Sequence, residues 1–136
     1  MFTLTVSDHV MIAHSFADPF FGPAQRLHGA TYTVEFGVVV PALNEHSVVM
    51  DIGALRATLR VVLDRLDYRN LDEHPDFAGK LSTTEQVAQF IADEMNERLQ
   101  HFSADSAARR PAELVCTLRE SPVAWASYTR RLGDTA

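Results

Sequence analysis

A change in the spacing of apolar residues near Asp51 constrains the fold of this 136-residue chain more than any other feature. Before that point, two stretches rich in β-branched and apolar residues predict strands over Phe2–Phe16 and Leu27–Val40. In the first stretch apolar and hydroxyl side chains alternate, as they do on a half-buried strand. Asp18-Pro19 and Gly22-Pro23 mark a loop between the two stretches. The strands are therefore expected to pair as a long antiparallel ribbon.

After Asp51 the apolar residues recur at steps of three and four, which predicts two amphipathic helices. Asp51 is the expected N-cap of the first helix, and Ser82-Thr83-Thr84-Glu85 predicts a capping box that opens the second. Ser103 to Pro111 interrupts the pattern after the second helix. The side chains expected to be buried are Ile52, Leu55, Leu59, Val62, Leu63 and Leu66 in the first helix and Val87, Phe90, Ile91, Met95 and Leu99 in the second.

Two closing strands, Leu114–Glu120 and Ala124–Arg131, complete the order strand, strand, helix, helix, strand, strand. This order predicts an α+β fold, a four-stranded antiparallel sheet with both helices on one face. The length fits one domain over residues 1–136. Such a sheet leaves two edges unpaired, so self-association is expected from the topology.

Composition and charge argue against several classes of function. The formal net charge of −6 and the lack of any long basic run argue against nucleic-acid binding. The longest apolar stretch, Val38–Leu43, is far too short to span a membrane, and the N-terminal residues do not resemble a secretory signal. A cytoplasmic protein is therefore expected. The single cysteine, Cys116, is expected to be a small buried hydrophobe.

Two histidines are the first candidates for chemistry. His14 falls near the end of the first strand and His28 near the start of the second, so the ribbon should bring them together. Position 30 shares a face with His28, because side chains on a strand alternate. An HxH metal half-site would have a histidine there, but the residue is Ala30. The alternative is a pair of hydrogen-bonded histidines that line a polar interface.

Six segments of the chain together point to a known family: Ala13-His14, Leu27-His28-Gly29-Ala30-Thr31-Tyr32, Val49-Met50-Asp51-Ile52-Gly53-Ala54-Leu55, Leu66-Asp67-Tyr68-Arg69-Asn70-Leu71, Thr83-Thr84-Glu85-Gln86-Val87-Ala88, and Glu120-Ser121-Pro122 with Ala126 and Tyr128. In these segments, and in their order over nearly the whole chain, the sequence resembles 6-pyruvoyltetrahydropterin synthase and its bacterial relative 6-carboxytetrahydropterin synthase. The resemblance implies a tunnelling fold, in which subunits join their sheets into a barrel. It also implies a hexamer of two trimers, with active sites at subunit boundaries.

The resemblance further implies a pterin substrate and a zinc ion held by three histidines, with a fourth position open to the substrate. His14 and His28 match the first two ligands, whereas Ala30 stands at the third. Loss of one imidazole should weaken zinc binding severely unless another donor replaces it. The candidate replacements are Asp8, His9, His46 and His74.

The family's proton relay is also incomplete. Ala24 stands at the position of the family's cysteine, and Asp67 and Tyr68 stand at its aspartate and histidine. Tyrosine has a reference pKa near 10, so it is a poor base at neutral pH, although it can donate a proton or orient an oxygen. The alternative roles are loop hydrogen bonding for Asp67, Asn70 and Asp72 and plain packing for Tyr68.

Glu120 matches the family residue that anchors the pterin ring. A carboxylate there accepts two hydrogen bonds, from the exocyclic amine and from the adjacent ring N–H. The alternative is that Glu120 is a solvated strand end.

Two classes of function follow. The first is a diverged lyase-type enzyme that acts on a pterin or a related bicyclic ring, with Asp67 and Tyr68 as catalytic residues. The second is a non-catalytic oligomer that binds a pterin or a purine. A purely structural oligomer is less favoured, because Glu120 and both histidines occur together. The missing residues argue against the standard 6-pyruvoyl or 6-carboxy synthesis.

Overall fold

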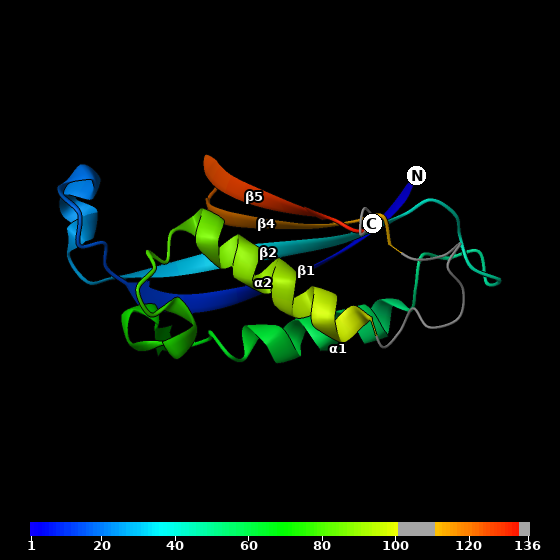
Figure 1. The fold of residues 1–136 in the computed structure, drawn as a ribbon, viewed down its shortest axis with the longest axis horizontal. Helices are drawn as coiled ribbons and strands as arrows, with labels where there is room; N and C mark the ends of the chain where they lie inside the picture. The colour runs from blue at the N-terminus through cyan, green and yellow to red at the C-terminus, as the bar shows by residue number, and fades with distance from the viewer. Residues whose placement is uncertain (101–110, 134–136) are drawn as a thin grey trace.

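The computed structural model describes residues 1–100 and 111–133. Its sheet is built on the hairpin formed by β1 (Phe2–His14) and β2 (His28–Val40). The two strands pair antiparallel along their whole length, from Phe2 opposite Val40 to His14 opposite His28 (Figure 1). The long ribbon predicted from the sequence is confirmed, although its first strand ends at His14 instead of Phe16.

Three further strands flank this hairpin. β4 (Glu113–Ser121) pairs antiparallel with β2, and β5 (Ala124–Arg131) pairs antiparallel with β4. On the other side of β1, β3 (Arg69–Asn70) runs parallel to it, which gives the order β3-β1-β2-β4-β5. The sheet thus has five strands, and the prediction of four was wrong by one. A strand of two residues cannot show the alternation by which strands are found in a sequence.

Both helices cover the same face of the sheet, which confirms the predicted α+β class. α1 (Ile52–Leu63) packs on β1, and α2 (Thr84–Leu99) packs on β4 and β5 (Figure 1). Asp51 caps α1 as expected, and its carboxylate accepts the amide hydrogen of Ala54. The connections contain short 3-10 helices: η1 (Pro19–Gln25), η2 (Leu71–Glu73) and η3 (Pro75–Phe77).

The start of α2 lies one residue later than the predicted capping box. Thr83 is the N-cap, and its hydroxyl oxygen accepts the amide hydrogen of Gln86 at 3.2 Å. The first backbone hydrogen bond of the helix therefore runs from the amide of Val87 to the carbonyl of Thr83. This shift leaves the carbonyl of Ser82 free to accept a hydrogen bond from His14.

The core lies between the helices and the sheet. Of the predicted helix stripes, Ile52 is 55% exposed because it begins α1, and Phe90 is only partly buried. Cys116 is fully buried as predicted, and burial raises the pKa of its thiol, which keeps it protonated. The largest fully buried side chains are Tyr32, Phe36, Leu55, Leu59, Leu63, Leu66, Leu71, Ile91, Met95, Leu114, Leu118 and Val10.

Two other expectations concern the chain as a whole. In the described part of the chain, no helix is both long enough and apolar enough to cross a membrane. The interruption predicted from Ser103 to Pro111 falls, apart from its last residue, outside the described residues.

Candidate functional site

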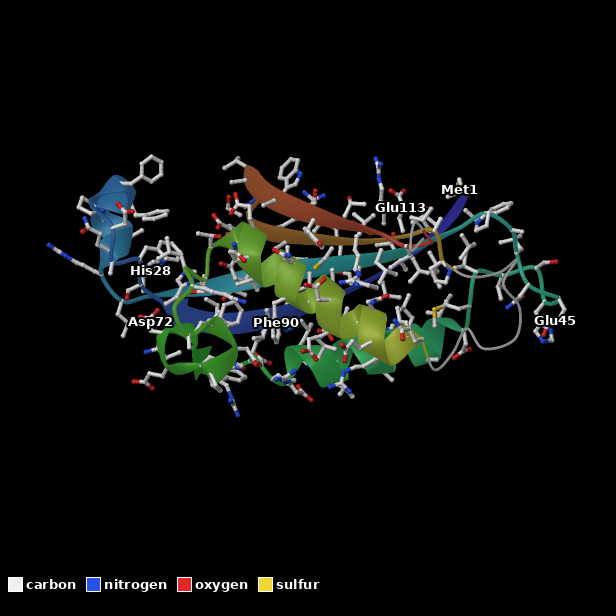
Figure 2. All side chains as sticks on the ribbon, in the orientation of Figure 1. Met1, His28, Glu45, Asp72, Phe90 and Glu113 are labelled. Carbon is white, nitrogen blue, oxygen red and sulfur yellow. The ribbon has the colours of Figure 1, made fainter. Side chains whose placement is uncertain are left out.

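The two histidines meet at one end of the sheet. His14 ends β1 and His28 begins β2, and the two are direct partners in the strand register. Their ring centroids lie 4.5 Å apart with the planes inclined by 63°. His14 is only 3% exposed, whereas His28 is partly exposed, near the connection between the strands (Figure 2). The structure therefore brings together the two residues that the sequence paired.

Backbone carbonyls hold both imidazoles in one tautomer. Nδ1 of His14 lies 2.9 Å from the carbonyl oxygen of Ser82, and Nδ1 of His28 lies 2.8 Å from that of Arg26. A carbonyl oxygen only accepts hydrogen bonds, so each ring donates from Nδ1. In the neutral rings, Nε2 is therefore the nitrogen that carries the lone pair.

Phenylalanine rings pack beside the pair. The ring of Phe16 lies 4.6 Å from that of His14 and 5.8 Å from that of His28, and Phe21 lies 4.7 Å from Phe16 on the side of η1. Burial, and next the neighbouring His28, lower the pKa of His14, while the Ser82 carbonyl and Asp72 act in the opposite sense. His14 is consequently neutral at pH 7.

The residues around the pair do not complete a three-ligand zinc site. Ala30 occupies the next position on the same face as His28 and stands opposite Ile12. Among residues 1–100 and 111–133, no group of three or more His, Cys, Asp or Glu side chains is arranged to hold a metal ion. The donor set offers two imidazoles where an open zinc site uses three protein ligands.

The four candidate replacements for the third ligand are placed elsewhere. His9 is exposed and points to the opposite face of β1, since it is an odd number of residues from His14. Asp8 lies 3.3 Å from the guanidinium of Arg60. His74 is buried and uses both nitrogens, donating from Nε2 to a carbonyl and accepting an amide hydrogen at Nδ1. His46 follows the end of β2, at the opposite end of the ribbon (Figure 2 labels its neighbour Glu45).

Asp67 is bound within the structure and does not reach the histidine pair. Its Oδ1 accepts the amide hydrogen of Met11 at 2.9 Å, and its Oδ2 accepts a hydrogen bond from Arg60 at 2.9 Å. Met11 lies three residues before His14 on β1, a separation of roughly 10 Å along a strand. Both oxygens of Asp67 therefore hold the turn that leads into β3.

Tyr68 projects from the edge of the sheet. Its backbone has a φ of 59°, a left-handed conformation that is uncommon for a residue with a Cβ, and its amide donates to the carbonyl of Met11 at 2.7 Å. The residue is 81% exposed. Within this chain, the structure does not bring Tyr68 to the histidine pair.

The residues near Tyr68 include a network that the sequence did not reveal. Arg60 contacts Asp8, Asp64 and Asp67 at 3.3, 2.8 and 2.9 Å, respectively. Burial alone would lower the pKa of Arg60, but these carboxylates together raise it. The only sequence signal was the spacing of Arg60 and Asp64, which are four residues apart on one helix face.

Asp72 has a structural role close to His14. Its two carboxylate oxygens accept hydrogen bonds from Ser15, from the amide at 3.0 Å and from the hydroxyl at 2.6 Å. Asn70 caps η2 by accepting the amide hydrogen of Asp72 at 3.0 Å. For these two residues, the loop hydrogen bonding considered from the sequence is what the structure contains.

Glu120 is held by the start of α2. It lies between Arg119, which pairs with Trp125, and Ser121, which pairs with Ala124, so the register shifts at this residue. Such a bulge redirects a side chain. The hydroxyl of Thr84 donates to Oε1 of Glu120.

Glu120 is also linked to the core through Thr84. The hydroxyl oxygen of the buried Tyr32 lies 3.4 Å from Oγ1 of Thr84. Since Thr84 donates to Glu120, Tyr32 is the donor in this second contact. Burial raises the pKa of Tyr32, so its hydroxyl keeps the hydrogen that it donates.

One short segment connects the histidine pair with Glu120. The carbonyl of Ser82 binds His14, and Thr84, two residues later, binds Glu120. On the sheet, Glu120 follows Arg119, which stands opposite Thr33, five residues from His28 on β2. The two parts of the site are thus separated by roughly 15 Å along the strands.

This architecture, in which two helices cover one face of a hairpin-based sheet, defines the class of tunnelling-fold proteins. The chain resembles the structure of Caenorhabditis elegans 6-pyruvoyl tetrahydropterin synthase with a TM-score of 0.71, covering 95% of each chain at 24% identity. It resembles that of the Plasmodium vivax enzyme with a TM-score of 0.76, covering 96% of this chain and 98% of that one at 20% identity. At these identities the similarity establishes the fold.

Sequence comparison establishes the family. A family model described as 6-pyruvoyl tetrahydropterin synthase matches residues 3–131, and the chain belongs to this family. It is 28% identical over 136 residues to 6-carboxy-5,6,7,8-tetrahydropterin synthase of Bacillus subtilis, covering 97% of this chain and 88% of the relative. It is 41% identical over 75 residues to 6-pyruvoyl tetrahydrobiopterin synthase of Drosophila melanogaster, covering 54% and 44%.

Proposed function

We propose that this protein binds a pterin or a related bicyclic ring and catalyses a lyase-type reaction on the side chain that the ring carries. Membership of the 6-pyruvoyl tetrahydropterin synthase family supports the ligand class. The long match to a 6-carboxy-5,6,7,8-tetrahydropterin synthase supports it further. The reaction differs from the standard syntheses, because Ala24 and Ala30 replace two of the side chains that those reactions use.

The orientation of Glu120 carries this proposal. One carboxylate oxygen is occupied by the hydroxyl of Thr84, and the bulge in β4 turns the residue out of the regular ladder. A carboxylate so held presents its remaining lone pairs to the paired N–H groups at the edge of a pterin ring. Such a contact is both charged and planar, so it selects heterocycles with adjacent N–H donors.

In this proposal, the catalytic residues come from two places. His14 and His28 lie at the reacting end of the ligand. Tyr68 donates a proton or orients an oxygen, and Asp67 holds the turn that presents it. Because Tyr68 points outward from the sheet edge, it serves the site of a neighbouring subunit.

Zinc has a restricted place in this proposal. His14 and His28 are the two residues that match zinc ligands of the family, one fewer than an open catalytic site uses. A bound zinc ion would polarise hydroxyl oxygens of the substrate. No step of the proposed reaction depends on it.

We also propose a cytoplasmic homo-oligomer, a hexamer of two trimers. β5 lies at one edge of the sheet, and β3 covers only two residues of β1 at the other. Unpaired edges of this kind are commonly covered by other subunits. The net charge of −6 is the basis for expecting no nucleic-acid partner.

The substitution Glu120→Gln tests the proposal. We expect it to weaken binding of a fluorescent pterin by at least about tenfold, because a hydrogen bond to a charged group contributes about 1.5 to 3 kcal/mol. Glu113→Gln is the matched control, since Glu113 lies on the same strand and pairs with Arg131 at 3.8 Å. Pterin affinity that is unchanged in Glu120→Gln would remove the ring-binding proposal.

A non-catalytic binding protein is the second candidate. The observation that favours it is that both oxygens of Asp67 accept hydrogen bonds within the fold, which hold Asp67 away from the histidine pair. Incubation with a dihydropterin that carries a hydroxylated side chain, followed by chromatography of the products, distinguishes the two. Binding with turnover supports the lyase, and binding without turnover supports the second candidate.

A further inference from the structure

We propose that His14 and His28 bind hydrogen-bond donors of the ligand directly, each through its Nε2 lone pair, with no metal ion between protein and ligand. The identity of the ligand rests on the proposed function, whereas the metal-free character of the pair does not. The groups that fit are two neighbouring hydroxyls, which supply one hydrogen to each ring.

The first step of the argument is the direction of the two rings. Their Nδ1 atoms are bound to the carbonyls of Ser82 and Arg26 at 2.9 and 2.8 Å, so neither ring is free to exchange its tautomer. Since the ring centroids lie only 4.5 Å apart, the two Nε2 acceptors belong to neighbouring rings. No reorganisation is needed before a donor arrives, which favours binding.

The second step is access to these acceptors. Among buried side-chain polar atoms of the described residues, Nε of Arg98 is the only one without a partner. Nε2 of His14 is thus not one of the buried unpaired atoms of the described residues, although His14 is only 3% exposed. His28 is more exposed than His14.

The third step concerns the position where a third ligand would stand. Positions 12, 14, 28 and 30 form two adjacent pairs on the helix-covered face, Ile12 opposite Ala30 and His14 opposite His28. A methyl group at position 30 leaves the two imidazoles without a third nitrogen. The ring of Phe16 packs against both imidazoles, and that of Phe21 packs against Phe16. Apolar neighbours make an unpaired acceptor costly, so a ligand hydroxyl that pairs with it gains affinity.

Metal analysis gives the first test. After equilibration with micromolar zinc and dialysis, we expect below about 0.1 zinc per chain in the wild-type protein, because two protein ligands are too few. Ala30→His restores the third imidazole on the same face and is expected to hold roughly one zinc per chain. Thr31→His is the matched control, since residue 31 points to the opposite face and should gain none.

The outcomes of this test are distinct. Stoichiometric zinc in the wild-type protein would overturn the inference and leave ring binding at Glu120 untouched. Failure of a folded Ala30→His variant to gain zinc would show that the two imidazoles are not directed as we describe. A gain restricted to Ala30→His supports the inference.

Ligand binding by metal-stripped protein gives the second test. We expect a pterin with a trihydroxypropyl side chain to bind roughly five- to thirtyfold more tightly than the same ring without it, as two hydrogen bonds would produce. His28→Ala should remove this preference, and His9→Ala, on the opposite face of β1, should keep it. If neither pterin binds, the proposed function fails. If both bind equally to the wild-type protein, only the present inference fails.

Discussion

At the scale of single residues, His14 shows how local surroundings set the charge of a site. It is buried at the end of β1 and lies against a second imidazole, and both effects lower its pKa. The hydrogen bond to the Ser82 carbonyl acts in the opposite direction but does not outweigh them. The result is a neutral acceptor at a position where a charged imidazole would repel donor groups.

The lowered pKa of His14 predicts a dependence of stability on pH. The folded state binds this proton more weakly than the unfolded chain does, so the unfolded state gains protons first as the pH falls below about 6.5. The free energy of unfolding should therefore decrease between pH 7.5 and pH 5.5. His14→Asn keeps a donor for the Ser82 carbonyl and should show a smaller decrease. Urea unfolding at the two pH values measures this decrease in the free energy of unfolding. An equal decrease in the wild-type and His14→Asn proteins would show that His14 is not its source.

At the scale of elements, the start of α2 connects two distant parts of the site. Ser82 orients His14 on β1, and Thr84 orients Glu120 on β4. Thr84 in turn accepts the hydroxyl of Tyr32 from β2. The segment therefore couples the position of Glu120 to that of the histidine pair.

Thr84→Val tests this coupling. Valine has nearly the same shape but no hydroxyl, so Glu120 loses its donor and the hydroxyl of Tyr32 loses its acceptor. We expect pterin affinity to fall about threefold to tenfold, in line with the loss of one oriented hydrogen bond. Thr83→Ser, which keeps the N-cap hydroxyl, is the control and should bind normally. Calorimetric titration measures both, and unaltered affinity in a folded Thr84→Val protein would show that Thr84 does not orient Glu120.

Arg60 on α1 likewise links separate elements, because it pairs with Asp8 on β1 and with Asp67 in the turn before β3. Arg60→Met keeps most of the apolar stem but leaves Asp8, Asp64 and Asp67 without their shared cation. We expect the free energy of unfolding to fall by about 1 to 2 kcal/mol. This is less than a fully buried cluster would lose, because Arg60 is partly exposed. Arg56→Met, one turn earlier and exposed, should change stability by less than about 0.5 kcal/mol. Chemical denaturation measures both changes. Equal losses of stability in Arg60→Met and Arg56→Met would contradict the stabilising role of Arg60.

At the scale of the whole molecule, regular periodicity determined how much could be predicted. The hairpin, both helices and the meeting of His14 with His28 follow from alternation, helical spacing and the loop between two strands. β3 has two residues and carries no period. The contact between Thr84 and Glu120 joins residues 36 positions apart, and no local pattern encodes it.

The chemistry of the site was predicted less completely than the fold. The sequence identified Ala30 as a missing ligand, but only the structure shows that Asp8, His9, His46 and His74 are placed or bonded elsewhere. Asp67 was a candidate proton donor by position, yet its oxygens are both bonded within the fold. Such engagement depends on tertiary contacts that residue type alone does not specify.

The central claim is that one carboxylate, Glu120, anchors a flat nitrogenous ring in this protein. The ratio of pterin dissociation constants for Glu120→Gln and wild type, measured by fluorescence on metal-stripped protein, tests it most directly. We predict a ratio of at least about ten, since the variant replaces a charge-assisted bidentate contact by a neutral one. A ratio near one, with both proteins folded, would contradict the account.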